Sequence, residues 1–319
     1  MSPLEAEWPP YFCNRHQVRL GDHLECTGHS IPVRNGIPRF AKSGYAAHFG
    51  EQWNRHRLTQ LDSYTGLPIS RQRLERCLGA VEIRGRQVLE CGCGAGRFTE
   101  VLLEDGAFVT SIDLSSAVDA NAQSFPVSAK HRIAQADILA LPFGPQQYEV
   151  VLCLGVIQHT PSPEDTIAAL YDQVRPGGWL VVDHYKPEWQ WYTQTAPLFR
   201  AVMKRLDPST SLRATERLTN MLLPVHKAVA TKPVLRAIWH RISPLMTHYV
   251  TYPQLNAELQ YQWALLDTHD SLTDHYKHRR NASEIGRILR DLGATEIVTA
   301  LGGNGVEARC RRAVGAAKP

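Results

Sequence analysis

The sequence contains no uninterrupted run of 18 apolar residues, so it predicts no transmembrane helix. Its first seven residues are acidic and lack the apolar core of a secretory signal, so we expect no signal peptide. There is no internal repeat. The chain has seven cysteines, two of them inside one glycine-rich loop, which argues against a disulfide scaffold. These features together favour a protein of the reducing cytoplasm.

The most informative segment is residues 90–96, which reads Glu-Cys-Gly-Cys-Gly-Ala-Gly. A short apolar strand ends in Glu90, and three glycines at alternate positions lead into a helix-like run. Such glycines let the backbone turn sharply and let a ligand lie against the main chain. A pyrophosphate would not favour a carboxylate before the loop, whereas the amine and sulfonium of S-adenosylmethionine would. An ordinary tight strand-to-helix turn is the alternative interpretation.

Further strand-like segments follow in regular order at residues 108–115, 131–138, 148–155 and 174–182. Asp113 ends the first of them and is suited to accept the ribose hydroxyls of a nucleotide. The next ends in Asp137, which could take the adenine amino group while Ile138 packs on the ring. Each acid alone could be a helix cap or a solvated turn. Their succession predicts a parallel, doubly wound α/β sheet.

The chain resembles the class I S-adenosylmethionine-dependent methyltransferases, and most of all the branch that contains the quinone-biosynthesis enzymes. The resemblance rests on the segments above, on Gly155–His159 and on the Arg-Pro-Gly-Gly turn at 175–178. The resemblance covers residues 45–185 well and 281–312 less closely. It implies a Rossmann-like seven-stranded sheet with an antiparallel last strand. The Phe-Gly-x-Gln-Trp segment around Gln52 resembles one that closes over the cofactor, although a helix packed on the sheet would explain it equally. The cofactor-binding residues that we expect are Glu90, Gly92, Cys93, Gly94, Gly96, Asp113, Leu114, Asp137, Ile138, Leu154, Gly155, Gln52 and Trp53.

Periodicity divides the chain into four parts. We expect an N-terminal zinc-knuckle-like segment at 1–45, a cofactor-binding core at 46–185, a helical lid inserted after the fifth strand at 186–280, and the end of the core at 281–319. In the last part, an amphipathic helix with a cap near Asn281 or Ser283 and a stop at Gly293 precedes a hairpin around residues 302–305.

The expected lid is strongly basic. Residues 190–260 contain nine Lys or Arg side chains and three acids, a balance of +6 in a chain whose net charge is +4. One interpretation is a lid that attracts an anionic acceptor, with Lys204, Arg205, Arg213 and Arg217 as anchors. The alternative is a solvated helix face.

The N-terminal segment contains two Cys-x2-His pairs separated by nine residues. Two thiolates and two imidazoles suit tetrahedral zinc, and four protein ligands would make such a site structural. The segment resembles the zinc knuckles that precede some methyltransferases, although those usually carry three or four cysteines. Chance placement is the alternative in a chain with 14 histidines. The candidate ligands are Cys13, His16, Cys26 and His29.

Transfer of a methyl group to a hydroxyl needs a general base as well as positioning. His159, after the fourth strand, and His184, after the fifth, are the candidates, and a packing or capping role is the alternative for His159. We therefore expect an S-adenosylmethionine-dependent methyltransferase acting on a small, anionic metabolite, by O-methylation. An RNA methyltransferase and an S-adenosylmethionine-binding protein without methyl transfer are the alternatives. DNA is not an expected partner, and the sequence does not indicate an oligomeric state.

Overall fold

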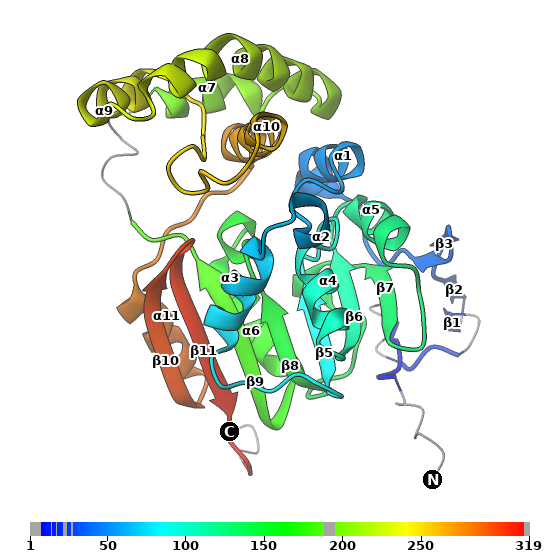
Figure 1. The fold of residues 1–319 in the computed structure, drawn as a ribbon. Coiled ribbons are helices and arrows are strands. Elements are labelled where there is room, and N and C mark those ends of the chain that lie inside the picture. Colours follow the sequence, from blue (N-terminus) through cyan, green and yellow to red (C-terminus); the bar gives the residue numbers. More distant parts are fainter. Residues whose placement is uncertain are drawn as a thin grey trace.

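A seven-stranded mixed sheet forms the centre of the molecule (Figure 1). The computed structural model describes residues 8–13, 15–16, 18–21, 24–26, 28–187 and 195–315. The strands lie in the order β7-β6-β5-β8-β9-β11-β10. Their bounds are β5 Gln87–Cys91, β6 Phe108–Asp113, β7 His131–Gln135, β8 Tyr148–Cys153, β9 Val174–His184, β10 Ala294–Gly302 and β11 Gly305–Arg312.

The strand directions confirm the fold expected from the sequence. Strands β7, β6, β5, β8 and β9 are parallel neighbours, whereas β11 pairs antiparallel with both β9 and β10. The sheet order reverses between β5 and β8, which is where open α/β sheets bind their ligands, beyond the carboxyl ends of the strands. The expected ligand site therefore lies at this edge.

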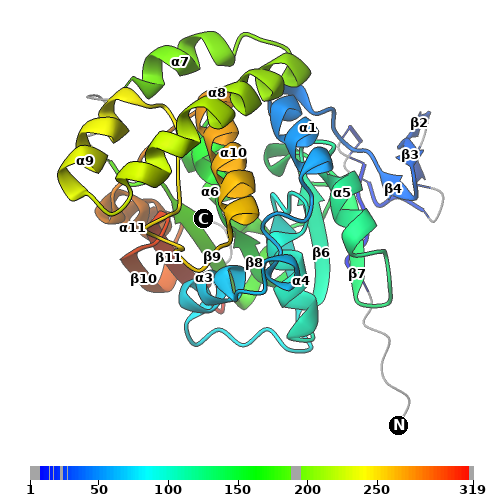
Figure 2. The same ribbon diagram turned by 45° about the horizontal axis from the view of Figure 1, so that its top comes forward.

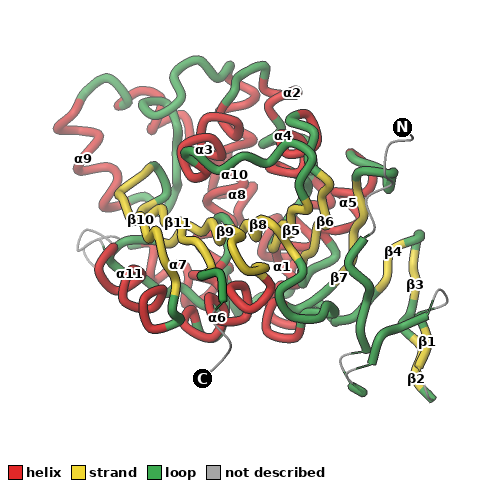
Figure 3. Tube along the Cα trace, turned by 90° about the horizontal axis from the view of Figure 1, so that it is seen from below, coloured by secondary structure: helices red, strands yellow, loops and turns green. Residues whose placement is uncertain are grey.

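Helices cover both faces of the sheet, which is seen edge-on in Figure 3. On one face, α3 (Ile69–Leu78) and α4 (Arg97–Glu104) pack on Val88, Val109 and Val150. On the other face, α6 (Pro163–Gln173) and α11 (Ala282–Asp291) pack on Leu89, Val151 and Leu180. Adjacent residues such as Val88 and Leu89 enter opposite cores because side chains alternate along a strand. The remaining short elements of this part are α2 (Asp62–Thr65), α5 (Ala117–Ser124), η2 (Ile138–Ala140) and η3 (Ile157–His159).

The C-terminal part agrees with the sequence signals. Asn281 accepts the Glu284 N–H at 2.9 Å, and the Glu284 carboxylate accepts the Asn281 N–H at 2.7 Å, a capping box that begins α11. Gly293 has φ of +75° just beyond the helix. Strands β10 and β11 then form the expected hairpin, with Gly302 paired to Gly305.

The N-terminal segment packs beside β7. It contains two small hairpins, β1 (Glu25–Cys26) with β2 (His29–Ser30) and β3 (Val33–Arg34) with β4 (Ile37–Pro38). Phe40 donates its backbone N–H to Gln135 at 2.8 Å, and the Arg39 guanidinium lies 2.6 Å from Asp119. These contacts cover the outer edge of the sheet.

Between β9 and α11 the described chain is helical. The helices are α7 (Ala196–Met203), α8 (Pro208–Val229), α9 (Pro233–Ile242) and α10 (Ala257–Thr273). Figures 1 and 2 show α10 beside α1 (Ala47–Arg55) and nearer the sheet than α7, α8 and α9. In the chain, α1 directly follows η1 (Gly44–Ala46). None of the described helices is long and apolar enough to cross a membrane.

Candidate active site

A cavity of about 450 Å³ lies between the carboxyl ends of the parallel strands and helix α10. It is lined by the glycine-rich loop from one side and by Asp267, Asp270 and Ser271 of α10 from the other. Its volume is within the range of small-molecule sites. Of the residues expected at the cofactor, those that line it are Trp53, Gly92, Cys93, Gly94, Asp113, Leu114, Asp137, Ile138, Leu154 and Gly155.

Close packing requires glycine at two points of the loop. Gly92 has φ of +77°, and a Cβ there would lie 2.2 Å from the Val156 side chain. Gly96 has φ of +102°, and a Cβ would lie 2.6 Å from the ring of Phe125. A side chain at either position would therefore push the loop out of its place at the cavity wall.

Asp113 holds the loop while facing the cavity. Its carboxylate accepts the Gly94 N–H at 3.0 Å and both the N–H and the hydroxyl of Ser115, at 2.8 and 2.7 Å. Burial raises the pKa of Asp113, although these three hydrogen bonds oppose the rise. Each carboxylate oxygen has two lone pairs, so Oδ2, which accepts one of these bonds, retains a lone pair for a ligand hydroxyl.

Glu90 differs from the expectation that it faces the cofactor. Its side chain is 2% exposed and does not line the cavity. Oε2 accepts hydrogen bonds from Thr99 at 2.6 Å and from Ser111 at 2.8 Å. Burial raises the pKa of Glu90 to about 7, against the effect of these hydrogen bonds. Strand alternation points Glu90 beneath α4, where it joins α4 to β6. Gly96, at the end of the loop, also does not line the cavity.

Gln52 is a second correction. It is fully buried, and it accepts a hydrogen bond from His269 and donates one to Asp270, both at 2.5 Å. It therefore joins α1 to α10 and does not line the cavity. Its neighbour Trp53 does, with its indole 3.6 Å from the position that a Cβ on Gly94 would occupy.

Two arginines of the cavity were not expected from the sequence. Arg73 forms a salt bridge with Asp183, which also accepts the Gly155 N–H at 2.6 Å. Arg97 donates to Ser70 at 3.1 Å and to Gln60 at 3.0 Å, and no described carboxylate lies within salt-bridge distance of it. Burial lowers the pKa of Arg97 to about 10. An acid ending a strand, the signal used for Asp113, could have identified Asp183.

His159 lines the cavity and belongs to a buried charged network. Its Nδ1 lies 3.1 Å from Oδ2 of Asp274 and 3.2 Å from the carbonyl oxygen of Tyr276. Asp274 has no exposed side-chain surface, and Arg200 and Lys277 approach it to 2.7 and 3.2 Å. Burial acts to raise the pKa of Asp274, but Lys277 and His159 outweigh it and hold the pKa below its ordinary value.

His184 does not face the cleft as expected. Its side chain is 1% exposed, its Nδ1 contacts the carbonyl of Tyr185 at 2.9 Å, and burial lowers its pKa. Its strand neighbours Asp183 and Tyr185 point toward the cavity side, so alternation places His184 on the opposite face.

The four lid cations named as anchors also lie outside the cavity. Arg213 donates to Ser209 and Thr210 of its own helix, and Arg205 and Arg217 are exposed. The cations that line the cavity are Arg73, Arg97, Lys186, Lys277 and Arg279. The net charge of the insertion does not indicate which of its side chains face the ligand.

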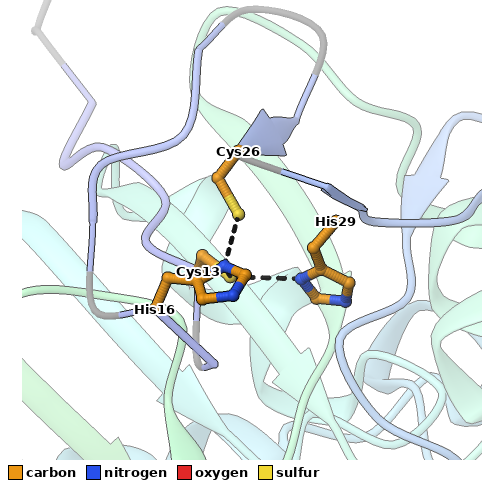
Figure 4. A group of neighbouring side chains, drawn as sticks. All are labelled: Cys13, His16, Cys26 and His29. Carbon is orange, nitrogen blue, oxygen red and sulfur yellow. Dashed lines mark hydrogen bonds between the residues drawn. The ribbon is translucent and has the colours of Figure 1, made fainter.

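The four N-terminal candidate ligands converge, as Figure 4 shows. Sγ of Cys13 lies 3.1 Å from Nδ1 of His29 and 3.6 Å from Nδ1 of His16, which lies 3.1 Å from Sγ of Cys26. All four ligand atoms are within 4.8 Å of one another. Tetrahedral zinc, with Zn–S of about 2.3 Å and Zn–N of about 2.0 Å, separates sulfur from nitrogen by about 3.5 Å.

Comparison with known proteins agrees with this geometry. Residues 89–182 match the family model described as a methyltransferase domain. Over these residues the chain is similar to methyltransferase domains. The expected resemblance to the class I S-adenosylmethionine-dependent enzymes is thus confirmed for the core.

Curated relatives match the methyltransferase domain over part of their length. The ubiquinone biosynthesis O-methyltransferase of Pseudomonas entomophila (strain L48) is 39% identical over 102 residues, which cover 31% of this chain and 44% of that protein. The protein of the same name from Pseudomonas savastanoi pv. phaseolicola is 40% identical over the same shares. The chain therefore spans less than half the length of these relatives.

Solved structures align over more of the chain at lower identity. A putative S-adenosylmethionine-dependent methyltransferase from Methanococcus maripaludis has a TM-score of 0.47 and 11% identity, covering 83% of this chain and 94% of that one. Magnesium protoporphyrin IX methyltransferase from Synechocystis PCC 6803, with bound SAH, has a TM-score of 0.42 and 14% identity, covering 76% and 82%.

Proposed function

We propose that this chain binds S-adenosylmethionine in the cavity and transfers its methyl group to a hydroxyl of a small, negatively charged acceptor. The observation that carries the proposal is that one cavity combines the glycine-rich loop and Asp113 with a carboxylate-linked histidine, His159. The matched methyltransferase domain and the names of its O-methyltransferase relatives support it.

The cavity residues fit the cofactor by charge and hydrogen bonding. Asp113 retains acceptor capacity for ribose, and Asp137, whose Oδ1 accepts the Leu139 N–H at 2.9 Å, lines the wall beside Ile138. Arg97 is a partly buried cation that has no carboxylate within salt-bridge distance among the described residues, which suits the methionine carboxylate. When bound, S-adenosylmethionine supplies a methyl group activated by its sulfonium.

His159 would act as the general base. In the neutral imidazole, a proton on Nδ1 is donated to the Tyr276 carbonyl, with Asp274 as a charged neighbour 3.1 Å away. Nε2 is then the nitrogen able to take a proton from an acceptor hydroxyl. Lys186, Lys277 and Arg279 line the cavity and favour an acceptor that carries negative charge. Helix α10 lines the opposite wall, which favours a small acceptor over a folded RNA.

Isothermal titration with S-adenosylmethionine tests the cofactor site. Asp113→Ala is expected to lose about 1–3 kcal/mol of binding free energy, because polar partners are left unpaired. Asp291→Ala is the matched control, since Asp291 is exposed at the end of α11. Wild-type affinity in Asp113→Ala would refute the ribose assignment.

Methyl transfer to 3,4-dihydroxybenzoate, with catechol as its uncharged counterpart, tests the acceptor class. Preference for the carboxylate-bearing probe and a fall of about 100-fold or more in kcat for His159→Gln are expected. A variant that retains wild-type kcat would remove His159 as the base.

We also propose that Cys13, His16, Cys26 and His29 bind one structural zinc ion. The support is that four ligand atoms of suitable type lie at separations close to those of tetrahedral zinc. Metal analysis of the purified protein is expected to find about one equivalent of zinc, lost in Cys13→Ser/Cys26→Ser. The control is Cys77→Ser/Cys310→Ser, because these cysteines are buried elsewhere in the core. Zinc-free wild-type protein would contradict the assignment.

A further inference from the structure

Helix α9 carries an apolar face that no described residue covers. None of its ten residues is buried. The exposed fractions are 70% for Val234, 49% for Leu235, 53% for Ile238 and 55% for Ile242. The spacing of four residues between Val234, Ile238 and Ile242 places them along one side of the helix.

Helix α7, which lies next to α9, also exposes apolar side chains. Its inner side packs Ala196 and Met203 on Leu272 of α10, while Leu198 and Val202 on its outer side are 72% and 60% exposed. The two helices meet where the Thr195 backbone N–H donates to the Arg241 carbonyl at 3.1 Å. The outer lid face is defined by Leu198, Val202, Val234, Leu235, Ile238 and Ile242.

The stretch of chain that contains α9 carries only positive charge. No acid occurs in the sequence between Glu216 and Glu258, whereas this stretch contains Arg217, Lys227, Lys232, Arg236 and Arg241. On α9, the exposed Lys232 and Arg241 flank the apolar side, and Arg236 turns back to donate to the Ala230 carbonyl at 3.0 Å. Apolar side chains bordered by cations are typical of helices that lie in the plane of a membrane interface.

We propose that the outer lid face docks on a bilayer that contains anionic phospholipids. The apolar side chains enter the acyl boundary, and Lys232 and Arg241 contact the phosphates beside them. In a dimer formed through this face, the cations of one copy would lie against the same cations of the other copy and repel them. An RNA backbone would contact the cations but leave the apolar row in water. Neither Lys232 nor any residue of the outer lid face lines the cavity, so docking leaves the cavity's own residues in place.

Sedimentation with vesicles of phosphatidylcholine, alone or mixed with phosphatidylglycerol, tests the proposal. Wild-type protein is expected to sediment with the mixed vesicles and only weakly with phosphatidylcholine. Val234→Glu/Ile238→Glu should lower the partition coefficient by more than about tenfold. Lys232→Gln/Arg241→Gln should lower it by about fivefold per cation removed. The matched controls are Val127→Glu/Leu301→Glu, which change exposed apolar residues elsewhere, and Lys130→Gln/Arg287→Gln; both should bind as wild type.

Three results would overturn the proposal. Wild-type protein that does not sediment with the mixed vesicles is the first. An equal loss in the control variants is the second, because it would indicate a general effect of charge. The third is a wild-type protein that does not bind vesicles but forms a dimer in light scattering, and whose dimer is dissociated by Val234→Glu/Ile238→Glu. This result would assign the face to a second copy of the chain.

Discussion

Asp274→Asn is expected to weaken the contacts that join helix α7 to η3. The carboxylate has no exposed side-chain surface and lies within 3.2 Å of Arg200 from α7, of Lys277 and of His159 from η3. Asparagine keeps the shape and removes the negative charge. Arg200 and Lys277, whose side chains are only 17% and 9% exposed, would then be buried without the carboxylate that balances their charge.

Breaking a buried ion pair by removing one partner costs about 3–5 kcal/mol. A domain of ordinary stability has about 5–15 kcal/mol in total, so this loss is large. Urea unfolding at pH 7 measures it, with Asp291→Asn as an exposed control expected to change stability by less than about 0.5 kcal/mol. A loss below about 1 kcal/mol in Asp274→Asn would refute the view that this carboxylate joins the elements around it.

The same network predicts a pH dependence. The pKa of Asp274 is lower in the folded protein than in the unfolded chain, so its stabilising contribution is complete above the ordinary carboxyl range and is lost as the pH falls through the folded pKa. Stability in acid should therefore fall less steeply in Asp274→Asn than in the wild type. In assays of methyl transfer, the variant is expected to lose about tenfold or more in kcat, because His159 loses the negative charge 3.1 Å from its Nδ1.

Two further predictions concern the loop. The pKa of Glu90 is raised to about 7, so its contribution to stability is complete below pH 4, and about 3 kcal/mol is lost as the pH rises through 7. Glu90→Gln should abolish this loss when urea unfolding is measured between pH 5 and 8. A pH profile of stability that is the same in the variant and the wild type would contradict the assignment. Arg97→Gln should weaken S-adenosylmethionine binding in calorimetry by about 1.5–3 kcal/mol, the range for hydrogen bonds to charged groups, whereas unchanged affinity would place the methionine carboxylate elsewhere.

The sequence was sufficient for the sheet because its signals are local. Strand β8 is almost wholly buried and apolar, and Asp113 follows the end of an apolar strand within the same segment. The direction in which a side chain points is harder to predict, because it depends on which elements pack on each face of the strand. Glu90 and Asp113 both end strands, but Glu90 points beneath α4 while Asp113 faces the cavity.

Contacts between distant segments could not be read from the sequence. Gln52 finds its partners more than two hundred residues away, in α10, and Arg200 reaches Asp274 across 74 residues. Composition gave the positive charge of the insertion correctly. It could not show that Arg213 would turn to its own helix while Lys277, outside the basic stretch, would line the cavity.

A crystal structure of the chain with S-adenosylhomocysteine would show directly whether the cavity is the cofactor site. The ribose hydroxyls are expected on Asp113, the adenine beside Asp137 and Ile138, the amino acid carboxylate at Arg97, and the sulfur open to the side of the cavity that His159 lines. Ligand bound outside this cavity, or within it with Asp113 and Arg97 uncontacted, would contradict the account.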